Sequence, residues 1–322
     1  MAESDIKSHF NLTSRGKSIL TSHQPTMQKR LFSTTPIQQI SPLTRRLFKL
    51  PASPPCPSPS HHDLGSFLTH AHRTNLAATN PVYQGTHYEY TVQRALRRLA
   101  FALDRVGGRD DAGVDLVGTW HVPGREHAVR VFVQCKALSR KAAPNLVREL
   151  EGSFRGGAAR IGVLVSSREA TQGVREAVAR SRHPVVWMMV RRDGRIQQVL
   201  WNRVVEALGL GRLEAVVRYM PQEGVGSGSR EVLLTWDGEE LPRMDQVEGD
   251  LETLQTQWLA LWKGATEADL ETLLDVVQGW FPAEKPLFTP SGLTGTCSTL
   301  SEPERERVLG AVRDRLSKGI ES

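Results

Sequence analysis

The chain has 322 residues, of which 39% are hydrophobic and 24% are charged, as in ordinary globular proteins. No stretch approaches the roughly 18 apolar residues that cross a bilayer. The three cysteines are far apart and show no metal-ligand or disulfide spacing. This composition therefore argues against a membrane span and against a disulfide-stabilised or cysteine-ligated metal protein.

The net charge of +6 comes entirely from the first 62 residues, and the remainder of the chain is neutral but polarised. Residues 83–220 carry +10, whereas residues 221–322 carry −10. The middle of the chain is therefore suited to face a polyanion such as DNA or RNA, and the C-terminal third is not.

Residues 6–62 contain no acidic residue and are rich in Ser, Thr and Arg, which is typical of a mitochondrial transit peptide. The motif Arg30-Leu31-Phe32-Ser33 resembles a matrix-protease cleavage site. We therefore predict import into mitochondria, with the matrix as destination, and removal of a segment that ends near Ser33. The alternative is an ordinary disordered basic tail.

Two early acids, Glu3 and Asp5, depart from the transit-peptide pattern, unless translation starts at Met27 or the acids are tolerated. Residues 51–60, PASPPCPSPS, are unsuited to a packed helix or sheet and indicate a linker. Residues 1–62 are accordingly assigned to a transit peptide and a Pro/Ser-rich linker.

The next segments alternate between helical and strand-like patterns. Apolar residues recur at helical spacing over residues 85–106, and two strand-like runs, 114–122 and 128–137, flank a turn at Pro123-Gly124. Further elements are predicted at 145–154 (helix), 161–166 (strand), 171–182 (helix), 185–190 (strand) and 196–201 (strand). This order predicts an α/β domain over residues 83–210, with a mixed sheet flanked by helices.

After the Gly/Ser-rich residues 224–229 the chain changes character. A short strand at 232–236 begins an acidic, mostly helical C-terminal region, residues 230–322, and Ser301-Glu302-Pro303-Glu304 forms a capping box for a last helix. Two roles are open for this region. It competes with nucleic acid for the basic core or recruits a protein partner, or else its apolar faces pack on the core and support folding.

Candidate catalytic residues lie on the two predicted hairpin strands. Side chains alternate along a strand, so Gln134 and Lys136 share one face, opposite Val133 and Cys135. Antiparallel pairing around the turn brings Asp115 to their level. We therefore predict that Asp115, Gln134 and Lys136 cluster at one sheet edge, with side-chain ends within ~10 Å, close enough to share one cation.

These residues form a recognisable set for phosphodiester hydrolysis. Asp115 offers a carboxylate, Gln134 an amide oxygen and Cys135 a backbone carbonyl, which are the oxygen ligands that Mg²⁺ or Mn²⁺ prefers. Lys136 is suited to hold the attacking water or to stabilise charge on phosphorus. Taken alone, such an Asp…Gln-x-Lys triplet occurs by chance in many proteins, as a turn acid and a solvated lysine.

The surrounding motifs give the triplet more weight. In chain order they are Gly85-x-x-x-Glu89, Gly113-Val114-Asp115, Val133-Gln134-Cys135-Lys136 and Val147-Arg148-Glu149-Leu150. This series resembles the Mrr-like branch of PD-(D/E)xK restriction-endonuclease folds, in which the lysine motif is typically QxK. The strings GTHYEYTVQRAL, GVDLVGTW and QCKA…PNLVRELEG also look like a fungal mitochondrial family named for a requirement in respiratory growth.

The resemblance implies a restriction-endonuclease-like fold and an Mg²⁺- or Mn²⁺-dependent endonuclease or exonuclease acting on mitochondrial DNA or RNA. It gives Glu89 the role of an additional acid beside the metal; the alternative is a solvated helix glutamate. Arg140, Lys141 and Arg148 follow the site and are candidates for contacts to phosphate groups.

Two other functions compete with catalysis. A neutral Gln134 gives a metal less charge than a carboxylate would, which favours a nucleic-acid-binding protein that kept the fold with little or no activity. The third hypothesis is an assembly factor whose acidic C-terminal region contacts a basic protein partner.

Overall fold

The computed structural model describes the predicted α/β domain and pieces of the chain on either side of it. The described residues are 58–107, 113–125, 128–154, 160–220, 229–260 and 302–319, with short pieces between 40 and 55 and between 266 and 275. They all belong to one unit of the chain, residues 36–322. The predicted transit peptide and its cleavage near Ser33 lie outside the described residues.

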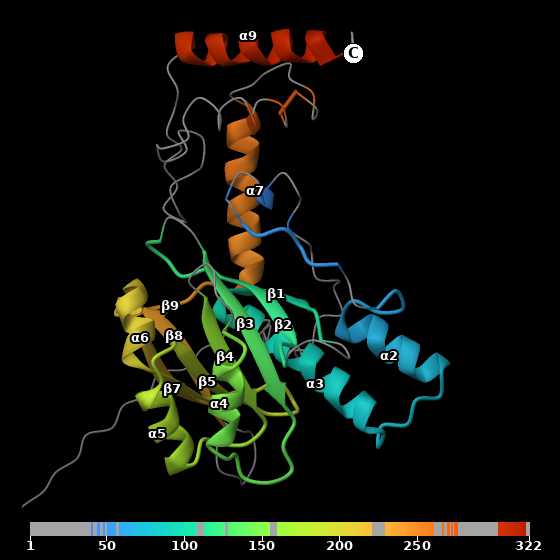
Figure 1. The fold of residues 1–322 in the computed structure, drawn as a ribbon, viewed down its shortest axis with the longest axis vertical. Coiled ribbons are helices and arrows are strands. Elements are labelled where there is room, and N and C mark those ends of the chain that lie inside the picture. Colours follow the sequence, from blue (N-terminus) through green and yellow to red (C-terminus); the bar gives the residue numbers. More distant parts are fainter. Residues whose placement is uncertain are drawn as a thin grey trace, which may run out of the picture. The chain divides into compact units, whose positions relative to one another are not determined.

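A six-stranded mixed sheet is the centre of the fold, and a three-stranded sheet follows it in the chain (Figure 1). The strands are β1 (Phe101–Arg105), β2 (Leu116–Trp120), β3 (Val129–Lys136), β4 (Ile161–Ser166), β5 (Val185–Val190), β6 (Ile196–Trp201), β7 (Leu213–Met220), β8 (Ser229–Trp236) and β9 (Glu239–Glu240). The helices are α2 (Leu64–Arg73), α3 (Pro81–Leu96), α4 (Asn145–Glu151), α5 (Gln172–Arg180), α6 (Arg203–Val205), α7 (Met244–Ala260) and α9 (Glu302–Gly319). The predicted α/β class, with a mixed sheet and flanking helices, is confirmed.

The large sheet has the strand order β1-β2-β3-β4-β5-β6. Its central pairs, β3–β4 and β4–β5, are parallel, and the outer pairs are antiparallel. Parallel neighbours need a crossover connection, which α4 and α5 provide. The carboxyl ends of β3, β4 and β5 therefore lie at one edge of the sheet, where the loops to both helices begin.

Side-chain alternation along the strands separates two apolar layers. Val131 and Val133 of β3 belong to the cluster that includes Val92 and Leu96 of α3. Phe132 belongs to the cluster formed with α4 and α5. The alternation predicted for β3 is therefore confirmed, and the sheet carries α3 on one face and α4 with α5 on the other.

The sequence interpretation was wrong at the end of the first helix, which was expected to continue to Val106. Instead, α3 ends at Leu96, a 3₁₀ turn (η1, Arg97–Leu99) follows, and Ala100 adopts a left-handed conformation with φ 62° that stops the helix. Residues 101–105 then form β1, where Phe101 stacks on Trp120 with ring centroids 4.5 Å apart. The spacing of Leu99 and Leu103 fits a helix, but it does not report the turn at Ala100.

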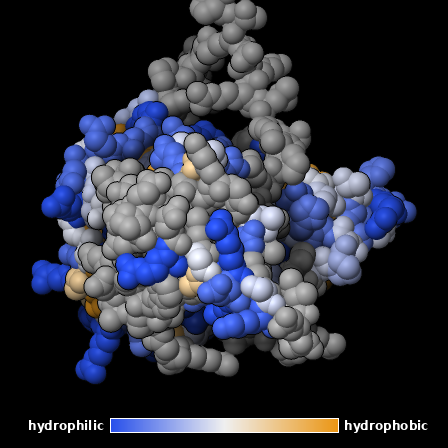
Figure 2. Space-filling view, turned by 90° about the horizontal axis from the view of Figure 1, so that it is seen from above, coloured by the Kyte–Doolittle hydropathy of each residue, from blue (hydrophilic) through white to orange (hydrophobic). Residues whose placement is uncertain are grey.

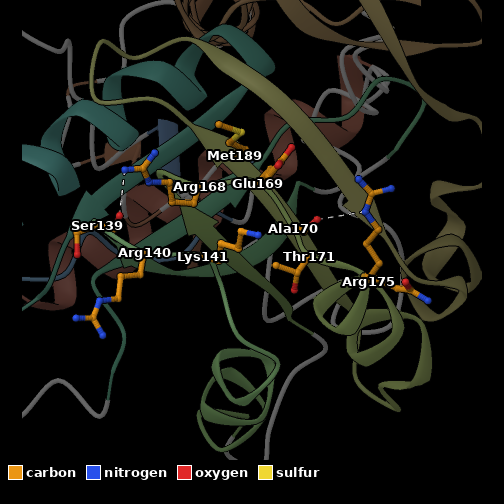
Figure 3. Close-up of a pocket in the computed structure, with 10 residues that line it drawn as sticks. Ser139, Arg140, Lys141, Arg168, Glu169, Ala170, Thr171, Arg175 and Met189 are labelled. Atoms are coloured by element: carbon orange, nitrogen blue, oxygen red, sulfur yellow. Dashed lines mark hydrogen bonds between the residues drawn. The ribbon is translucent and has the colours of Figure 1, made fainter.

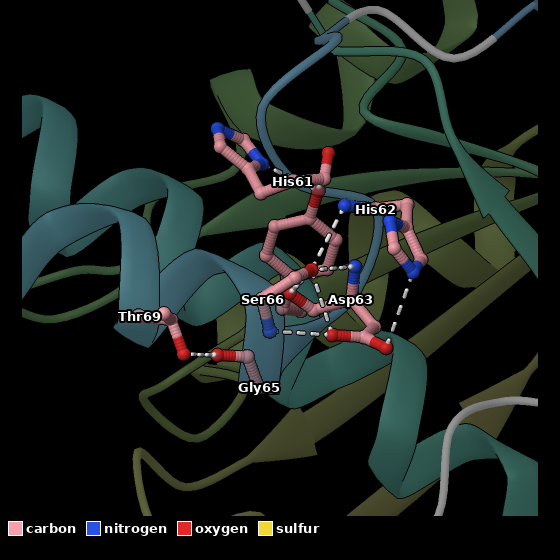
Figure 4. A network of polar contacts seen from close by, with 7 residues as sticks. His61, His62, Asp63, Gly65, Ser66 and Thr69 are labelled. Carbon is pink, nitrogen blue, oxygen red and sulfur yellow. Dashed lines mark hydrogen bonds and ion pairs between the residues drawn. The ribbon is translucent and has the colours of Figure 1, made fainter. Parts of the chain in front are cut away.

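The helix α2 was not expected from the sequence. It begins with a capping box in which the backbone amide of Ser66 donates to the Asp63 carboxylate at 2.7 Å (Figure 4). Just before it, the His61 Nδ1 lies 2.8 Å from the Tyr90 hydroxyl of α3. Phe67 packs against the same tyrosine ring, so α2 and the segment before it are fastened to α3.

The second sheet and α7 share the core of the large sheet. Leu234 of β8 and Met244 and Val247 of α7 are fully buried in the cluster that holds α3. Arg97 pairs with Glu248 of α7 at 2.6 Å, and both side chains are mostly buried.

On the face shown in Figure 2 the described residues are mainly hydrophilic. Among the described residues, no helix is long and apolar enough to cross a membrane.

Candidate functional site

Asp115 lies at the start of the predicted hairpin, between the ends of β1 and β3. The register pairs Leu116 with Val133, which confirms the antiparallel hairpin. The carboxylate Oδ2 of Asp115 accepts the backbone N–H of Cys135 at 2.6 Å. The aspartate therefore meets β3 between the other two predicted site residues, Gln134 and Lys136.

A missing side chain at Gly107 leaves room for two carboxylates. The position that a Cβ of Gly107 would occupy is 3.3 Å from the Glu89 Oε2 and 3.4 Å from the Asp115 Oδ1. Glu89 reaches this position from α3, and Asp115 reaches it from the loop before β2. The two acids named from the sequence thus border the same space.

Glu89 is not a solvated helix glutamate. Its side chain is 14% exposed, and its Oε2 accepts from the Nε of Arg105 at 2.5 Å. The Arg105 guanidinium lies 5.6 Å from the centre of the Tyr90 ring, a cation–π contact. Sequence reasoning missed Arg105, because its pairing with Glu89 depends on how β1 packs beneath α3.

Gln134 is buried, with 5% of its surface exposed. Its amide nitrogen fits against Gly113, where an added Cβ would lie 2.8 Å away and where φ is +81°. Its side-chain oxygen has no hydrogen-bond partner among the described residues. A buried polar oxygen without a partner is costly, so this position suits an electrophile such as a cation.

Lys136, at the end of β3, is partly exposed and contacts α4. Its Nζ lies 3.2 Å from the Glu149 Oε2, and the other Glu149 oxygen accepts from the Asn145 amide. The Glu149 side chain is 44% exposed, so this surface pair stabilises the fold weakly and can open. The sequence motif contained Glu149, but its pairing with Lys136 was not foreseen.

Cys135 is held as a neutral thiol. Burial raises the pKa of this thiol, and the negative charges of Asp115 and Glu89 raise it further. A thiol is a poor nucleophile and a poor metal ligand. The contribution predicted for Cys135 is its backbone carbonyl, and that role stays a prediction.

The donor set fits a hard cation better than a soft one. Within the described residues, no three His, Cys, Asp or Glu side chains form a metal-binding cluster. The candidate ligands are instead the two carboxylates beside Gly107, those of Asp115 and Glu89, and the side-chain oxygen of Gln134 on the adjacent strand, which lies beside Gly113 and has no partner among the described residues. Oxygen ligands of this kind suit Mg²⁺ or Mn²⁺, once Glu89 is released from Arg105.

Comparison with known proteins shows that this region is similar to a protein family. A family model described as Required for respiratory growth protein 7 matches residues 80–128 and 122–219. The matched region is called the family core below (residues 80–219). It contains every site residue named above.

Individual relatives are mitochondrial fungal proteins. An uncharacterized mitochondrial protein of Schizosaccharomyces pombe is 33% identical over 47% of this chain and 63% of its own length. Required for respiratory growth protein 7, mitochondrial, of Saccharomyces cerevisiae is 32% identical over 24% of this chain and 49% of its own length. The protein of the same name from Vanderwaltozyma polyspora is 28% identical over 24% of this chain and 47% of its own length.

The present chain thus spans between about half and two thirds of the length of these relatives. The protein is mitochondrial, as predicted. No solved structure matches it.

The basic residues predicted to contact phosphate groups do not all lie together in the family core. Arg140 and Lys141 line a pocket of about 1100 Å³, whereas Arg148 is exposed on α4 and is not part of its lining (Figure 3). Two further lining arginines, Arg168 and Arg175, were not named from the sequence. They follow β4 in the chain, so only the sheet topology reveals that they adjoin the β3 residues.

Proposed function

We propose that this protein is a metal-dependent phosphodiesterase of the PD-(D/E)xK type that acts on mitochondrial nucleic acid and is needed for respiratory growth. The observation that supports this most is the position of the Asp115 carboxylate. It is bound to the backbone N–H between Gln134 and Lys136 and borders, with Glu89, the space at Gly107. The requirement for respiratory growth is carried over from the names of the relatives.

Each residue has a distinct role in this proposal. Asp115, the Gln134 oxygen and the Cys135 carbonyl would hold Mg²⁺, with Glu89 as a further ligand or as a base for water. The bound cation would lower the pKa of water and polarise the phosphoryl oxygen. Lys136 supplies a positive charge to the water or to the oxygens on phosphorus, after leaving Glu149.

A second candidate function, nucleic-acid binding with little or no catalysis, also has structural support. Gln134 brings no negative charge to the site, and Glu89 is already neutralised by Arg105. Both features lower the affinity for a divalent cation. A cleavage assay separates the two functions.

The test is cleavage of labelled single-stranded DNA, double-stranded DNA and RNA by the purified protein with Mg²⁺, Mn²⁺ or EDTA. We expect cleavage with either metal and none with EDTA. Asp115→Asn and Lys136→Met should each lower the rate by about 100-fold or more, as when a group that stabilises the transition state is removed. Arg130→Gln, an exposed cation on the same strand, is the matched control and should cleave at the wild-type rate.

If no substrate is cut with any metal while the protein still binds nucleic acid, the binding function is correct. If Lys136→Met cleaves as fast as the Arg130→Gln control, the assignment of the site is wrong.

A further inference from the structure

The pocket that contains Arg140 and Lys141 lies at the sheet edge where β3, β4 and β5 end. Its walls are the loop from β3 to α4 and the loop from β4 to α5, and Met189 of β5 also lines it (Figure 3). We call it the basic pocket and define it by Arg140, Lys141, Arg168 and Arg175. In open α/β sheets, ligands bind at this edge because the crossover loops diverge there.

The two loops are fastened to each other, so the basic pocket is formed before any ligand arrives. Arg168 donates to the backbone oxygen of Ser139 at 3.1 Å, and the Thr171 hydroxyl donates to the oxygen of Ala142 at 3.1 Å (Figure 3 draws the first bond). On the far side, the backbone N–H of Ala170 donates to the Gln198 side chain at 2.8 Å. A preformed site loses less entropy on binding than a flexible one.

The charge of the basic pocket is not compensated. It has four cations and a single acid, Glu169, and among the described residues none of the four cations has an ion-pair partner. Two arginines elsewhere in the core, Arg97 and Arg98, are by contrast paired with Glu248 and Glu231. The first turn of α5, which starts at Gln172 beside the pocket, adds a partial positive charge.

The basic pocket also adjoins the candidate site. Lys136 is the register partner of Ser166, and its backbone oxygen accepts from the Ser167 N–H at 3.2 Å. Both pocket loops therefore begin where the predicted catalytic strand ends. At about 1100 Å³ the pocket is near the upper end of the range typical of ligand sites, so it has room for an extended ligand.

We propose that the basic pocket binds the phosphodiester backbone of a nucleic-acid strand, next to the phosphate group that Lys136 would contact. This inference rests on the proposed function and extends it, because it gives the path of the strand across the protein surface, from the end of β3 to the start of α5. Arg168 and Arg175 bind phosphate groups with their free N–H groups and carry no base specificity.

The experiment measures binding of a labelled single-stranded oligonucleotide, by fluorescence anisotropy across a salt series, with EDTA present so that no strand is cut. The variant is Arg168→Gln/Arg175→Gln. The charge-matched control is Arg180→Gln/Arg203→Gln. Both residues lie at the opposite edge of the sheet, where the end of α5 and the start of α6 are joined by hydrogen bonds from the Asn202 side chain to the backbone oxygens of Ser181 and His183. Thermal melts verify that both proteins fold.

We expect the dissociation constant of the pocket variant to rise about tenfold at low salt, and the salt slope to fall by about 0.7 for each phosphate group that the variant no longer binds. The control should change binding by less than about twofold. If Arg168→Gln/Arg175→Gln fails to fold, Arg140→Gln/Lys141→Gln serves instead, since both side chains are exposed.

Three results would overturn the proposal: no binding by the wild-type protein, equally weakened binding in pocket and control variants, or a nucleoside monophosphate binding as tightly as the oligonucleotide. The last would assign the pocket to a single phosphate ester. Wild-type binding without cleavage would refute the catalytic proposal and leave the pocket proposal supported. A pocket variant that cleaves and binds like the wild type would refute the pocket proposal and leave the catalytic proposal supported.

Discussion

Glu89 has two proposed or observed partners. It is proposed to help hold a cation, and in the structure it is bound to Arg105. Both side chains are mostly buried, at 14% and 13% exposure, so each charge depends on the other. Removing one charge leaves the second partly buried without compensation. The structural and catalytic roles of Glu89 can be separated on this basis.

We predict that Glu89→Gln lowers the free energy of unfolding by about 1–3 kcal/mol, measured by urea denaturation, because Arg105 is left unpaired. The double variant Glu89→Gln/Arg105→Gln should recover most of this stability, because no unpaired charge remains. If Glu89 also supports catalysis, the stable double variant stays inactive with Mg²⁺. Recovery of cleavage together with stability would show that Glu89 is only structural.

His121 makes the stability of the protein depend on pH. It is buried beside Thr119, and burial, together with the charge of Arg45, lowers its pKa to about 4. When the pH falls below about 6.5, the ordinary pKa of histidine, His121 becomes protonated in the unfolded chain but stays neutral in the folded protein. Stability is therefore lost as the pH falls from about 6.5 towards 4, and the loss levels off below that.

The expected contribution of His121 is a loss of about 2 kcal/mol between pH 7.5 and pH 5. Urea denaturation at both values measures it. His121→Gln should show a flatter pH dependence, although it is less stable at pH 7.5 because a buried hydrogen-bonded ring is replaced. His72→Gln, at an exposed position of α2, should keep the wild-type slope. Equal slopes for wild type and His121→Gln would contradict the prediction.

At the residue scale the sequence named the candidate site residues but did not predict which residues they contact. Alternation within β3 was enough to place Gln134 and Lys136 on one face. The partners Arg105 and Glu149 come from other elements, so their approach depends on packing across layers, which periodicity does not report. The catalytic roles themselves remain predictions.

Elements were predictable where a single pattern decided them. The continuous apolar runs of β4 and β5 have the expected bounds, as buried parallel strands should. By contrast, β7 was missed, and its Val217 and Tyr219 are exposed, so no buried face marks it as a strand. The strand β1 was hidden by spacing that also suits a helix.

The pairing of β1 with β2 depends on one glycine. A Cβ on Gly118 would lie 1.9 Å from the backbone oxygen of Ala102 and 3.0 Å from the Cα of Leu103, and neither backbone atom can move freely. We predict that Gly118→Ala lowers the free energy of unfolding by about 2–4 kcal/mol. Gly249→Ala in α7, where nothing lies within 4 Å of the added Cβ, should instead stabilise the protein by about 0.5–1 kcal/mol.

Both glycine variants are measured by urea denaturation at the same pH. An unchanged midpoint for Gly118→Ala would mean that β1 and β2 separate more easily than the structure indicates.

At the scale of the whole molecule, the charge asymmetry of the sequence is partly cancelled by folding. Acids of the C-terminal third pair with arginines of the family core: Glu231 with Arg98, Glu240 with Arg218, and Asp245 and Glu248 with Arg97. These acids already form ion pairs, so they are not available to compete with nucleic acid for other basic residues. Residues 261–322 retain a net charge of only −3, which leaves little to compete with nucleic acid.

We therefore predict that a protein truncated after Ala260 folds and binds nucleic acid within about twofold of the full chain at low salt. It keeps α7, whose Met244, Val247 and Leu251 are buried in the core, so truncation before Met244 should unfold the protein. Anisotropy titrations across a salt series and thermal melts decide. A several-fold gain in affinity that disappears at high salt would support the competing-tail hypothesis instead.

The parallel pairing of β3 with β4 also sets an order of assembly. Leu116 meets Val133 across a short hairpin, whereas Lys136 meets Ser166 only after all of α4 has crossed over. Closing the longer loop costs more entropy and is slower. We therefore expect the contact between Asp115 and β3 to form before β3 pairs with β4. The basic pocket, which needs β4 and α5, should form later than this contact.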